Sequence, residues 1–329
     1  MVPATFPAFR IHSDAAGYRS GIEAVALDDL SPGEIVIQTA YSSVNYKDAL
    51  AGTGKGKILR QFPLVGGIDV AGHVVQSRDP AFKEGDAVLC TGCGLSETRD
   101  GGYAAYARLE SRWAIPLPAG LDLRESMILG TAGFTAGLAL LRMQDNRQTP
   151  DLGPLAVTGA TGGVGSLAIA IFSKAGYAVH AVSGKAGQAD WLRSLGASEV
   201  LGRDALSTSK PMDTARFGGG LDNVGGAMLH ALLAHTAPYG NVATAGLAAT
   251  HDLATTVMPF IIRGVSLLGV ASAGTARDLR DAVWRRLSSD WKPARLSDIA
   301  TREVGLDGLA AVFDDMLAGG SLGRTVVRF

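Results

Sequence analysis

A loop with four glycines in seven residues lies between two apolar runs in VTGATGGVGSLAIAI, residues 157–171. Its spacing, Ala160-x-Gly162-x-x-Gly165, is the dinucleotide-binding pattern with alanine in the first position. Such glycines let the chain turn tightly, let a pyrophosphate approach bare backbone, and let the next helix lie close to its strand. The N-terminus of that helix adds N–H groups and a positive dipole end. The loop is predicted to bind a dinucleotide; the alternative is a tight turn without a ligand.

The residues after the next predicted strand discriminate between the two nicotinamide cofactors. Ser183 stands where an acidic residue usually binds the ribose hydroxyls of NAD. Gly184 and Lys185 follow it, and Arg203 ends the strand after that. No carboxylate repels a 2′-phosphate here, and two cations are available to bind one, so the pattern favours NADPH. The alternative for Lys185 is an ordinary solvated loop lysine.

Strands and helices alternate around this loop from residue 155 onward. Helices are predicted in GSLAIAIFSKAG and AGQADWLRSLGA, and strands in LAVTGA, YAVHAVSG, GGLDNVGG, GNVATAGL and GVSLLGVA. The alternation predicts a parallel sheet with helices on both faces. The first part of the chain instead predicts short antiparallel strands and then a helix, over 34–44, 69–77, 85–92, 104–110 and 124–144. The tail predicts two helices, ARDLRDAVWRRLSSD and LDGLAAVFDDMLAGG, and the strand RTVVRF.

The composition limits the classes of function. The chain has 329 residues, of which 47% are hydrophobic and 19% charged, which suits about two folded domains. A formal net charge of −1 gives no field that would attract nucleic acid or an anionic membrane. No uninterrupted apolar run reaches the roughly 20 residues of a membrane span, and the start MVPATFPAFRIH lacks a signal-peptide pattern. A soluble, cytoplasmic protein is expected.

Cys90 and Cys93 are the two cysteines, in CTGCG. They are too few for a disulfide framework or for a four-ligand structural zinc site. The apolar AVLC before the glycines indicates a strand that runs into a loop, and a redox pair is the alternative.

With these residues placed, the chain resembles the medium-chain dehydrogenase/reductases. Within them it resembles the acrylyl-CoA reductase group, which is often described as quinone oxidoreductase-like. The resemblance runs nearly end to end, and it is carried by SSVNYKDALAGTGKGKILRQFPLVGGIDVAG, ILGTAGFTAG, VTGATGGVG, AVSGK, LGASEVLGRD, TTVMPFIIRGVSLLGVAS and GRTVV.

The resemblance implies an α/β protein of two domains. Residues 126–272 would form a Rossmann domain, a doubly wound parallel sheet that binds NADP(H). Residues 1–125 would form a mostly β, GroES-like catalytic domain, which the C-terminal tail 273–329 completes. The active site would lie in the cleft between the two domains, and the protein would be a homodimer.

The resemblance also implies which residues contact the cofactor. In this sequence they are Tyr46, Thr161, Gly162, Gly163, Val164, Ser183, Gly184, Lys185 and Arg203. Three more would line the nicotinamide half, namely Leu247, Ile261 and Ser272.

A metal site is not expected. Zinc-dependent relatives place a cysteine in the segment that matches VNYKD and a Gly-His-Glu in the segment that matches GIDVAG. This chain has Asn45 in the first segment and Gly67-Ile68-Asp69 in the second. An amide and an isoleucine cannot replace a thiolate and an imidazole as zinc ligands. The region after Asp86 also lacks the four cysteines of a structural zinc lobe.

The reaction implied is reduction of the carbon–carbon double bond of an α,β-unsaturated acyl-CoA thioester, most simply acrylyl-CoA to propionyl-CoA. Tyr46 and Asn45 are expected in a turn at the site. Tyr46 would lie against the nicotinamide and present its hydroxyl, and Asn45 would donate to the developing enolate. The alternatives are that Tyr46 only shapes the pocket and that Asn45 only caps a turn. Lys47 and Asp48 are expected as a structural pair or a cap.

Three cations in GTGKGKILRQF, Lys55, Lys57 and Arg60, are candidates for contacts with the phosphates of coenzyme A; the alternative is a solvated loop. Two other functions stay open. An NADPH:quinone oxidoreductase would need a flat apolar acceptor pocket, and a non-catalytic NADPH-binding protein would need no shaped nicotinamide pocket.

Overall fold

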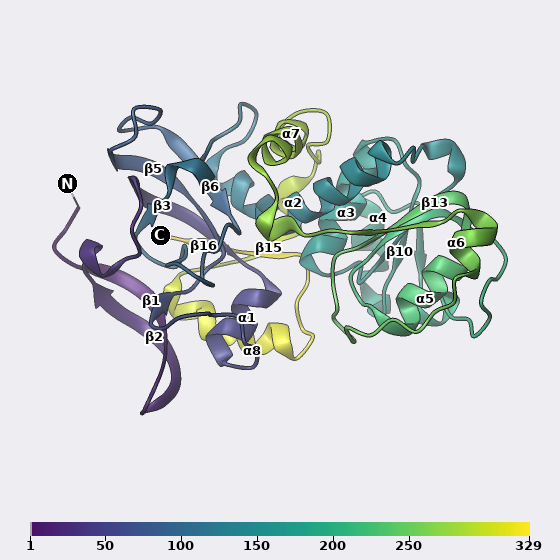
Figure 1. Cartoon of the computed structure of the whole chain (residues 1–329), viewed down its shortest axis with the longest axis horizontal. Helices are drawn as coiled ribbons and strands as arrows, with labels where there is room; N and C mark the ends of the chain where they lie inside the picture. Colours follow the sequence, from purple (N-terminus) through teal and green to yellow (C-terminus); the bar gives the residue numbers. More distant parts are fainter. Residues whose placement is uncertain (1) are drawn as a thin grey trace. The chain divides into compact units, whose positions relative to one another are not determined.

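The computed structural model describes residues 2–329, which form two compact units (Figure 1). The first unit consists of the chain up to Thr131 together with Ala273–Ala282 and Ser297–Phe329. The second consists of Ala132–Ser272 and Val283–Leu296. Residues 283–296, which were expected in the first domain with the rest of the tail, thus lie in the second unit. The predicted domain limits stay a prediction.

The second unit is built on a six-stranded parallel sheet. Its strand order is β11-β10-β9-β12-β13-β14, with bounds Leu155–Thr158 (β9), Val179–Val182 (β10), Glu199–Leu201 (β11), Phe217–Asp222 (β12), Thr236–Thr244 (β13) and Ser266–Gly269 (β14). The helices that lie wholly in this unit are Gly163–Lys174 (α3), Ala189–Ser194 (α4), Gly226–Ala234 (α5) and Met258–Arg263 (α6).

Two features make this sheet doubly wound. Every residue of β9 and of β12 is buried, as expected for central strands that are covered on both faces. From β9 the chain winds first through β10 to β11, and later through β12 and β13 to β14 on the other side. Right-handed crossovers in opposite directions place the helices on opposite faces. The predicted α/β class with a doubly wound parallel sheet is confirmed.

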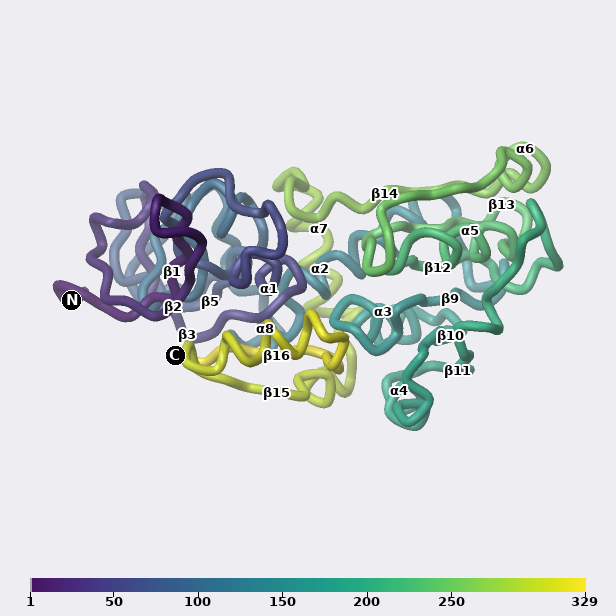
Figure 2. The backbone as a smooth tube through the Cα atoms, turned by 90° about the horizontal axis from the view of Figure 1, so that it is seen from below, coloured from purple at the N-terminus to yellow at the C-terminus, as the bar shows by residue number. Residues whose placement is uncertain are grey.

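The first unit contains a seven-stranded and a three-stranded sheet. The larger has the order β15-β16-β3-β5-β6-β8 with β7 beside β3, and its strands are Ile35–Val44 (β3), Asp69–Ser77 (β5), Ala87–Thr91 (β6), Tyr106–Leu109 (β7), Ile115–Pro116 (β8), Ala300–Val304 (β15) and Arg324–Arg328 (β16). The smaller has the order β2-β1-β4, with Phe6–Asp14 (β1), Gly17–Val25 (β2) and Leu64–Val65 (β4). β16 pairs antiparallel with β3, so the end of the chain completes a sheet that the N-terminal part begins (Figure 2).

Helices α1 (Tyr46–Thr53) and α8 (Leu309–Leu317) lie side by side in this unit (Figures 1 and 2). A Cβ on Gly52 would lie 2.3 Å from the ring of Phe313, so α1 approaches α8 closely because it has glycine there. The rings of Phe9, Tyr103 and Phe313 pack together in the core of this unit, with centroids 5.7–6.4 Å apart. The core therefore fixes α1 firmly in the unit.

Helix α2 (Leu123–Asp145) is kinked at Gly130, whose φ of +47° and ψ of −154° are not helical. The chain passes from the first unit to the second directly after this kink, and again within α7 (Arg277–Leu287). Among residues 2–329, α2 is the one helix long and apolar enough to cross a membrane. However, 83% of its most apolar stretch is buried inside the protein, as in a core helix.

Candidate active site

The glycine loop joins β9 to α3 in the second unit. A Cβ on Gly165 would lie 2.3 Å from the carbonyl oxygen of Gly159, so only glycine lets α3 approach its own strand this closely. Gly162, the N-cap of α3, differs, because a Cβ there would meet no protein atom closer than 3.4 Å. The packing of the protein does not require glycine at 162. Its missing side chain instead leaves the backbone accessible, as a pyrophosphate needs.

A pocket of about 480 Å³ lies beside this loop within the second unit. Its wall consists of residues at or after the carboxyl ends of β9, β10, β11, β12 and β13, and the strand order reverses at β9. Open parallel sheets bind their ligands at such a switch point. The lining residues are Gly159, Thr161, Val182, Ser183, Gly184, Lys185, Arg203, Val224, Gly225, Gly226, Ala227, Met228, Ala248, Ala249 and Thr250.

The end of β10 gives this pocket a cationic edge. Ser183 is buried, and its hydroxyl accepts the backbone N–H of Lys185 at 3.0 Å. The guanidinium of Arg203 lies directly over Gly184, 2.6 Å from where a Cβ would be, so glycine makes room for the arginine. None of the described residues that line the pocket is acidic. A ligand at this edge therefore meets a hydroxyl and two positive charges, which suits a phosphate.

We predict that Lys185→Ala weakens NADPH binding by about tenfold and changes NADH binding by less than about twofold. A charged hydrogen bond contributes roughly 1.5–3 kcal/mol, and 1.4 kcal/mol is a factor of ten. Fluorescence titration of each cofactor checks this, with Lys174→Ala as a control, because Lys174 is an exposed lysine at the other end of α3. An equal loss for both cofactors would contradict a contact with the 2′-phosphate.

Two parts of the pocket wall were not predicted from the sequence. They are the segments Val224–Met228, after β12, and Ala248–Thr250, after β13. The sequence did contain a signal for the first segment, namely the glycines Gly225 and Gly226 that follow the strand ending at Asp222. In a parallel sheet this strand end lies at the same edge as the glycine loop after β9. The second carries no such pattern in its own residues.

In the first unit, Asn45 and Tyr46 begin helix α1 rather than lying in a simple turn. Asn45 is the N-cap, and Asp48 accepts its backbone N–H at 2.8 Å, as the third helical residue of a capping box does. Lys47 pairs with Glu97 and not with Asp48. Tyr46 is 48% exposed, so its phenol is accessible at the positive end of the helix dipole.

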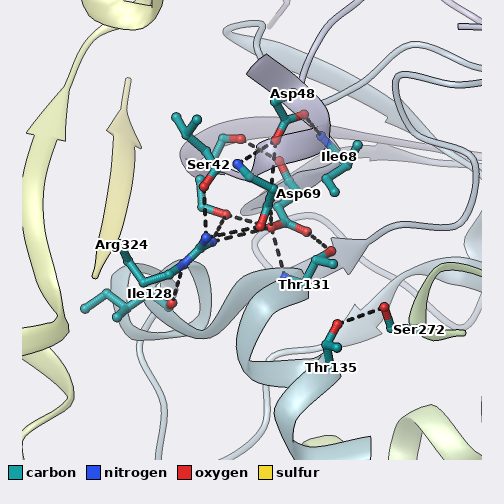
Figure 3. Close-up of polar contacts among 12 residues, drawn as sticks. Ser42, Asp48, Ile68, Asp69, Ile128, Thr131, Thr135, Ser272 and Arg324 are labelled. Atoms are coloured by element: carbon teal, nitrogen blue, oxygen red, sulfur yellow. Dashed lines mark hydrogen bonds and ion pairs between the residues drawn. The ribbon is translucent and has the colours of Figure 1, made fainter. Parts of the chain in front are cut away.

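Behind this helix start lies a buried polar network around Asp69 (Figure 3). The carboxylate of Asp69 accepts from Ser43 Oγ at 2.6 Å, from Asn45 Nδ2 at 2.8 Å, and from the backbone N–H and hydroxyl of Thr131 at 3.0 and 2.6 Å. Arg324 Nη2 lies 3.8 Å from the same carboxylate. Donors from three separate chain segments, 43–45, 131 and 324, thus converge on one buried charge.

Arg324 completes the network from the C-terminal strand β16. Its guanidinium donates to the carbonyls of Ile128 and Val44, to Asn45 Oδ1 and to Ser43 Oγ, at 2.7–3.1 Å. The kink in α2 leaves space for it, because a Cβ on Gly130 would lie 2.6 Å from Asp69 Oδ2 and 2.9 Å from Arg324 Nη2. The network therefore ties β3, α1, β5, α2 and β16 together.

The side-chain amide of Asn45 is used entirely inside this network. Its nitrogen donates to Asp48 at 3.2 Å and to Asp69 at 2.8 Å, and its oxygen accepts from Arg324 at 3.1 Å. Burial, and then the negative charge of Asp69, raise the pKa of Asp48 to about 7. Burial also lowers the pKa of Arg324, against the effect of the two carboxylates.

The other predicted site residues lie outside these two centres. Leu247 and Ile261 are 61% and 73% exposed on the second unit. Ser272 accepts the hydroxyl of Thr135 at 2.8 Å (Figure 3). The cations Lys55, Lys57 and Arg60 are exposed on the loop after α1. Gly163 and Val164 form the first turn of α3.

The comparisons with known proteins bear on both units. Residues 31–119 match the family model described as alcohol dehydrogenase GroES-like domain, and residues 163–289 match the one described as zinc-binding dehydrogenase. YhfP of Bacillus subtilis (strain 168), which carries a provisional name as a quinone oxidoreductase, is 43% identical over 325 residues, with 98% of each chain covered. The chain belongs to the medium-chain dehydrogenase/reductase family. Within this family of oxidoreductases it is also 41% identical over 311 residues to acrylyl-CoA reductase AcuI of Ruegeria pomeroyi, with 94% of each chain covered.

Crystal structures of family members agree with the fold. The yhdH oxidoreductase of Salmonella enterica, in complex with NADP, is 41% identical and aligns with a TM-score of 0.94 over 98% of this chain and 99% of that one. Bacillus subtilis yhfP with NAD bound is 42% identical and aligns with a TM-score of 0.95 over 99% and 100%. Both nicotinamide cofactors therefore occur among relatives of this medium-chain dehydrogenase/reductase.

Although one matched family is described as zinc-binding, residues 2–329 contain no cluster of three or more His, Cys, Asp or Glu side chains that could hold a metal ion. Asn45 donates a hydrogen bond to Asp69 instead. Both residues lie in segments that match the ligand segments of zinc-dependent members. Cys90 and Cys93 are both free and buried. Hydrogen bonding between the two thiols raises the pKa of Cys90 and lowers that of Cys93.

Proposed function

We propose that this protein uses NADPH to reduce the carbon–carbon double bond of an α,β-unsaturated acyl-CoA thioester, with acrylyl-CoA as substrate and propionyl-CoA as product. The choice of NADPH is supported by the edge of the pocket, which contains Ser183, Lys185 and Arg203 and no acidic residue. The substrate class is supported by the near full-length similarity to acrylyl-CoA reductase AcuI. We further propose that Thr161, Gly162, Gly163 and Val164 hold the pyrophosphate.

NADPH, when bound, supplies a hydride to the β-carbon of the thioester, and negative charge then develops on the thioester oxygen. The protein must stabilise that charge and bring a proton to the α-carbon. We propose that Tyr46 contributes both its ring, to orient the nicotinamide, and its hydroxyl, as a donor to the oxygen. The start of α1 favours negative charge at the same place.

Asn45 was expected as a second donor to the enolate. Because both hydrogens of its amide are already donated to Asp48 and Asp69, we propose that it positions Tyr46 instead. Leu247, Ile261 and Ser272 remain proposed neighbours of the nicotinamide. Lys55, Lys57 and Arg60 are proposed to contact the phosphates of coenzyme A, since they are exposed on the loop that follows α1.

A second candidate is NADPH:quinone reduction, which the provisional name of YhfP favours. Steady-state NADPH oxidation with acrylyl-CoA, a benzoquinone and no acceptor separates the candidates. We expect turnover with acrylyl-CoA to exceed that with the quinone by at least about tenfold. Preference for the quinone would overturn the proposed substrate, and NADPH binding without turnover would indicate a non-catalytic binder.

We expect the purified protein to keep full activity after exhaustive treatment with a chelator, because the proposed chemistry takes its electrophilic assistance from Tyr46 and not from a metal. Metal analysis of the treated sample checks that it is metal-free, and a zinc-dependent alcohol dehydrogenase treated in parallel serves as the control. Loss of activity that zinc restores would contradict the proposal.

We also propose a cytoplasmic homodimer. The sheet edge at β14 is unpaired within the described chain; Val257 and Ile262, in the segment just before β14, and Tyr239, on the neighbouring β13, are exposed. An exposed apolar patch beside an open strand edge is typical of an interface between subunits.

A further inference from the structure

The network behind Tyr46 holds two carboxylates and one guanidinium. Asp48 and Asp69 are 1% and 0% exposed, and both accept from the same amide nitrogen of Asn45. Among residues 2–329, the one cationic side chain paired with either of them is Arg324, which lies beside Asp69 and is itself 2% exposed. Burying an uncompensated charge is costly, so a buried group in this position gains a proton instead. One of the two carboxylates is therefore expected to be neutral.

Hydrogen bonding indicates which one. Asp69 accepts four hydrogen bonds and lies beside Arg324, as an ionised carboxylate does. Asp48 Oδ2 accepts from both nitrogens of Asn45, whereas Oδ1 accepts only the backbone N–H of Ile68, at 2.9 Å. Oδ1 is thus the oxygen of the pair with room for a proton.

An acceptor for that proton is also present. The hydroxyl of Tyr103, which is 1% exposed, lies beside the side chain of Asp48 and interacts with it. Tyr103 gives its own proton to the carbonyl of Ser43 at 3.1 Å, so its oxygen is left to accept. A chain of hydrogen bonds from Asp48 through Tyr103 to the carbonyl of Ser43 would give each of these groups a hydrogen-bond partner.

We propose that Asp48 is a positioning residue that works as a neutral carboxylic acid, donating its proton to the hydroxyl oxygen of Tyr103 and holding Asn45 and the start of α1. Asp69 and Arg324 then balance each other. The groups that face Asp48 are Asp69 on β5, Tyr103 ahead of β7 and Arg324 on β16. Burial, and then the negative charge of Asp69, raise the pKa of Asp48 to about 7.

The consequence for the reaction rests on the proposed function. When Asp48 ionises, a net negative charge lies behind Asn45 and Tyr46 and disfavours the negative charge that develops on the thioester oxygen. Turnover should therefore fall as the pH rises through about 7. The KM for NADPH should stay constant, because the proposed cofactor pocket lies in the second unit.

Stability should depend on pH in the same direction. The pKa of Asp48 is raised in the folded protein from an ordinary value of 3.8 to about 7. The folded state thus holds a proton that the unfolded state has lost. Its contribution to stability is complete below about 4 and is lost as the pH rises through about 7.

The direct test is infrared difference spectroscopy of the cofactor-free protein across pH 5–9. We expect the carbonyl band of one protonated, solvent-inaccessible carboxyl group, which disappears with a midpoint near 7 and is absent in Asp48→Asn. The matched control is Asp190→Asn, whose aspartate side chain is fully exposed. A wild-type spectrum without the band, or a band that survives in Asp48→Asn, would overturn the proposal. This readout needs no turnover, so it is independent of whether acrylyl-CoA is the substrate.

Tyr103→Phe tests which group accepts the proton of Asp48. It also provides a second test of the proposal if Asp48→Asn does not fold. It removes the acceptor, so the midpoint of the band should move to lower pH by about one unit, and the fall in turnover should move with it. Asp48→Asn should give turnover that is flat between pH 6 and 8. A midpoint that moves to higher pH in Tyr103→Phe would show that Tyr103 donates to an ionised Asp48, and this would contradict the proposal.

Discussion

Replacing Tyr46 by phenylalanine is expected to lower turnover with acrylyl-CoA by about 10²-fold, the low end for one acid–base group. The physical reason is the loss of the hydroxyl that we propose as the donor to the developing oxyanion at the start of α1. The ring remains, so the KM for NADPH should change by less than about twofold. Steady-state kinetics at saturating NADPH measure the effect.

Two further variants make this prediction specific. Tyr46→Ala should weaken cofactor binding as well, because the ring is lost. Tyr239→Phe is a matched control, since Tyr239 is an exposed tyrosine of the second unit, 76% accessible, which we place at the proposed subunit interface and not in the reaction. If Tyr46→Phe is silent while Tyr46→Ala is impaired, the hydroxyl has no part in the reaction. If both are silent, Tyr46 is not in the site.

Arg324→Met is expected to lower the free energy of unfolding of the first unit by about 3–5 kcal/mol, the usual cost of breaking a buried ion pair from one side. Asp69 would keep its buried charge without a counter-ion, and four acceptors would lose their donor. Chemical denaturation followed by circular dichroism measures the change.

The control for this prediction is Arg302→Met. Arg302 pairs with Asp315 at the surface, where the side chains are 44% and 38% exposed, and exposed pairs contribute about 0–1 kcal/mol. Equal effects of the two substitutions would show that the buried network contributes no more than a surface ion pair.

The parts of the fold that the sequence predicted best are those with local signals. The strand predicted over 69–77 is β5, residue for residue, and the alternation after residue 155 became the doubly wound sheet. Strands β1, β2 and β15 were not predicted individually. β2 and β15 have mostly exposed or half-buried residues, so their hydrophobic pattern is weak.

The candidate site also has residues that could be placed from the sequence and residues that could not. Ser183, Lys185 and Arg203 follow successive strands, and a parallel sheet brings its strand ends to one edge, so their place on one pocket could be reasoned from the sequence. The network of Asp69 and Arg324 could not, because its members are 255 positions apart and each alone looks like an ordinary charged residue. The helical start at Asn45 was likewise taken for a turn, since α1 has only eight residues and three contacts with the network define its beginning.

Isotope transfer shows whether the protein moves a hydride from NADPH to the β-carbon of acrylyl-CoA. The protein is incubated with acrylyl-CoA and NADPH deuterated at C4 of the nicotinamide on the transferred face, and the product is analysed by mass spectrometry and NMR. We predict one propionyl-CoA for each NADPH oxidised, with a single deuterium at C3 and a solvent-derived proton at C2. NADPH oxidation that leaves acrylyl-CoA unchanged, or propionyl-CoA without deuterium at C3, would contradict it.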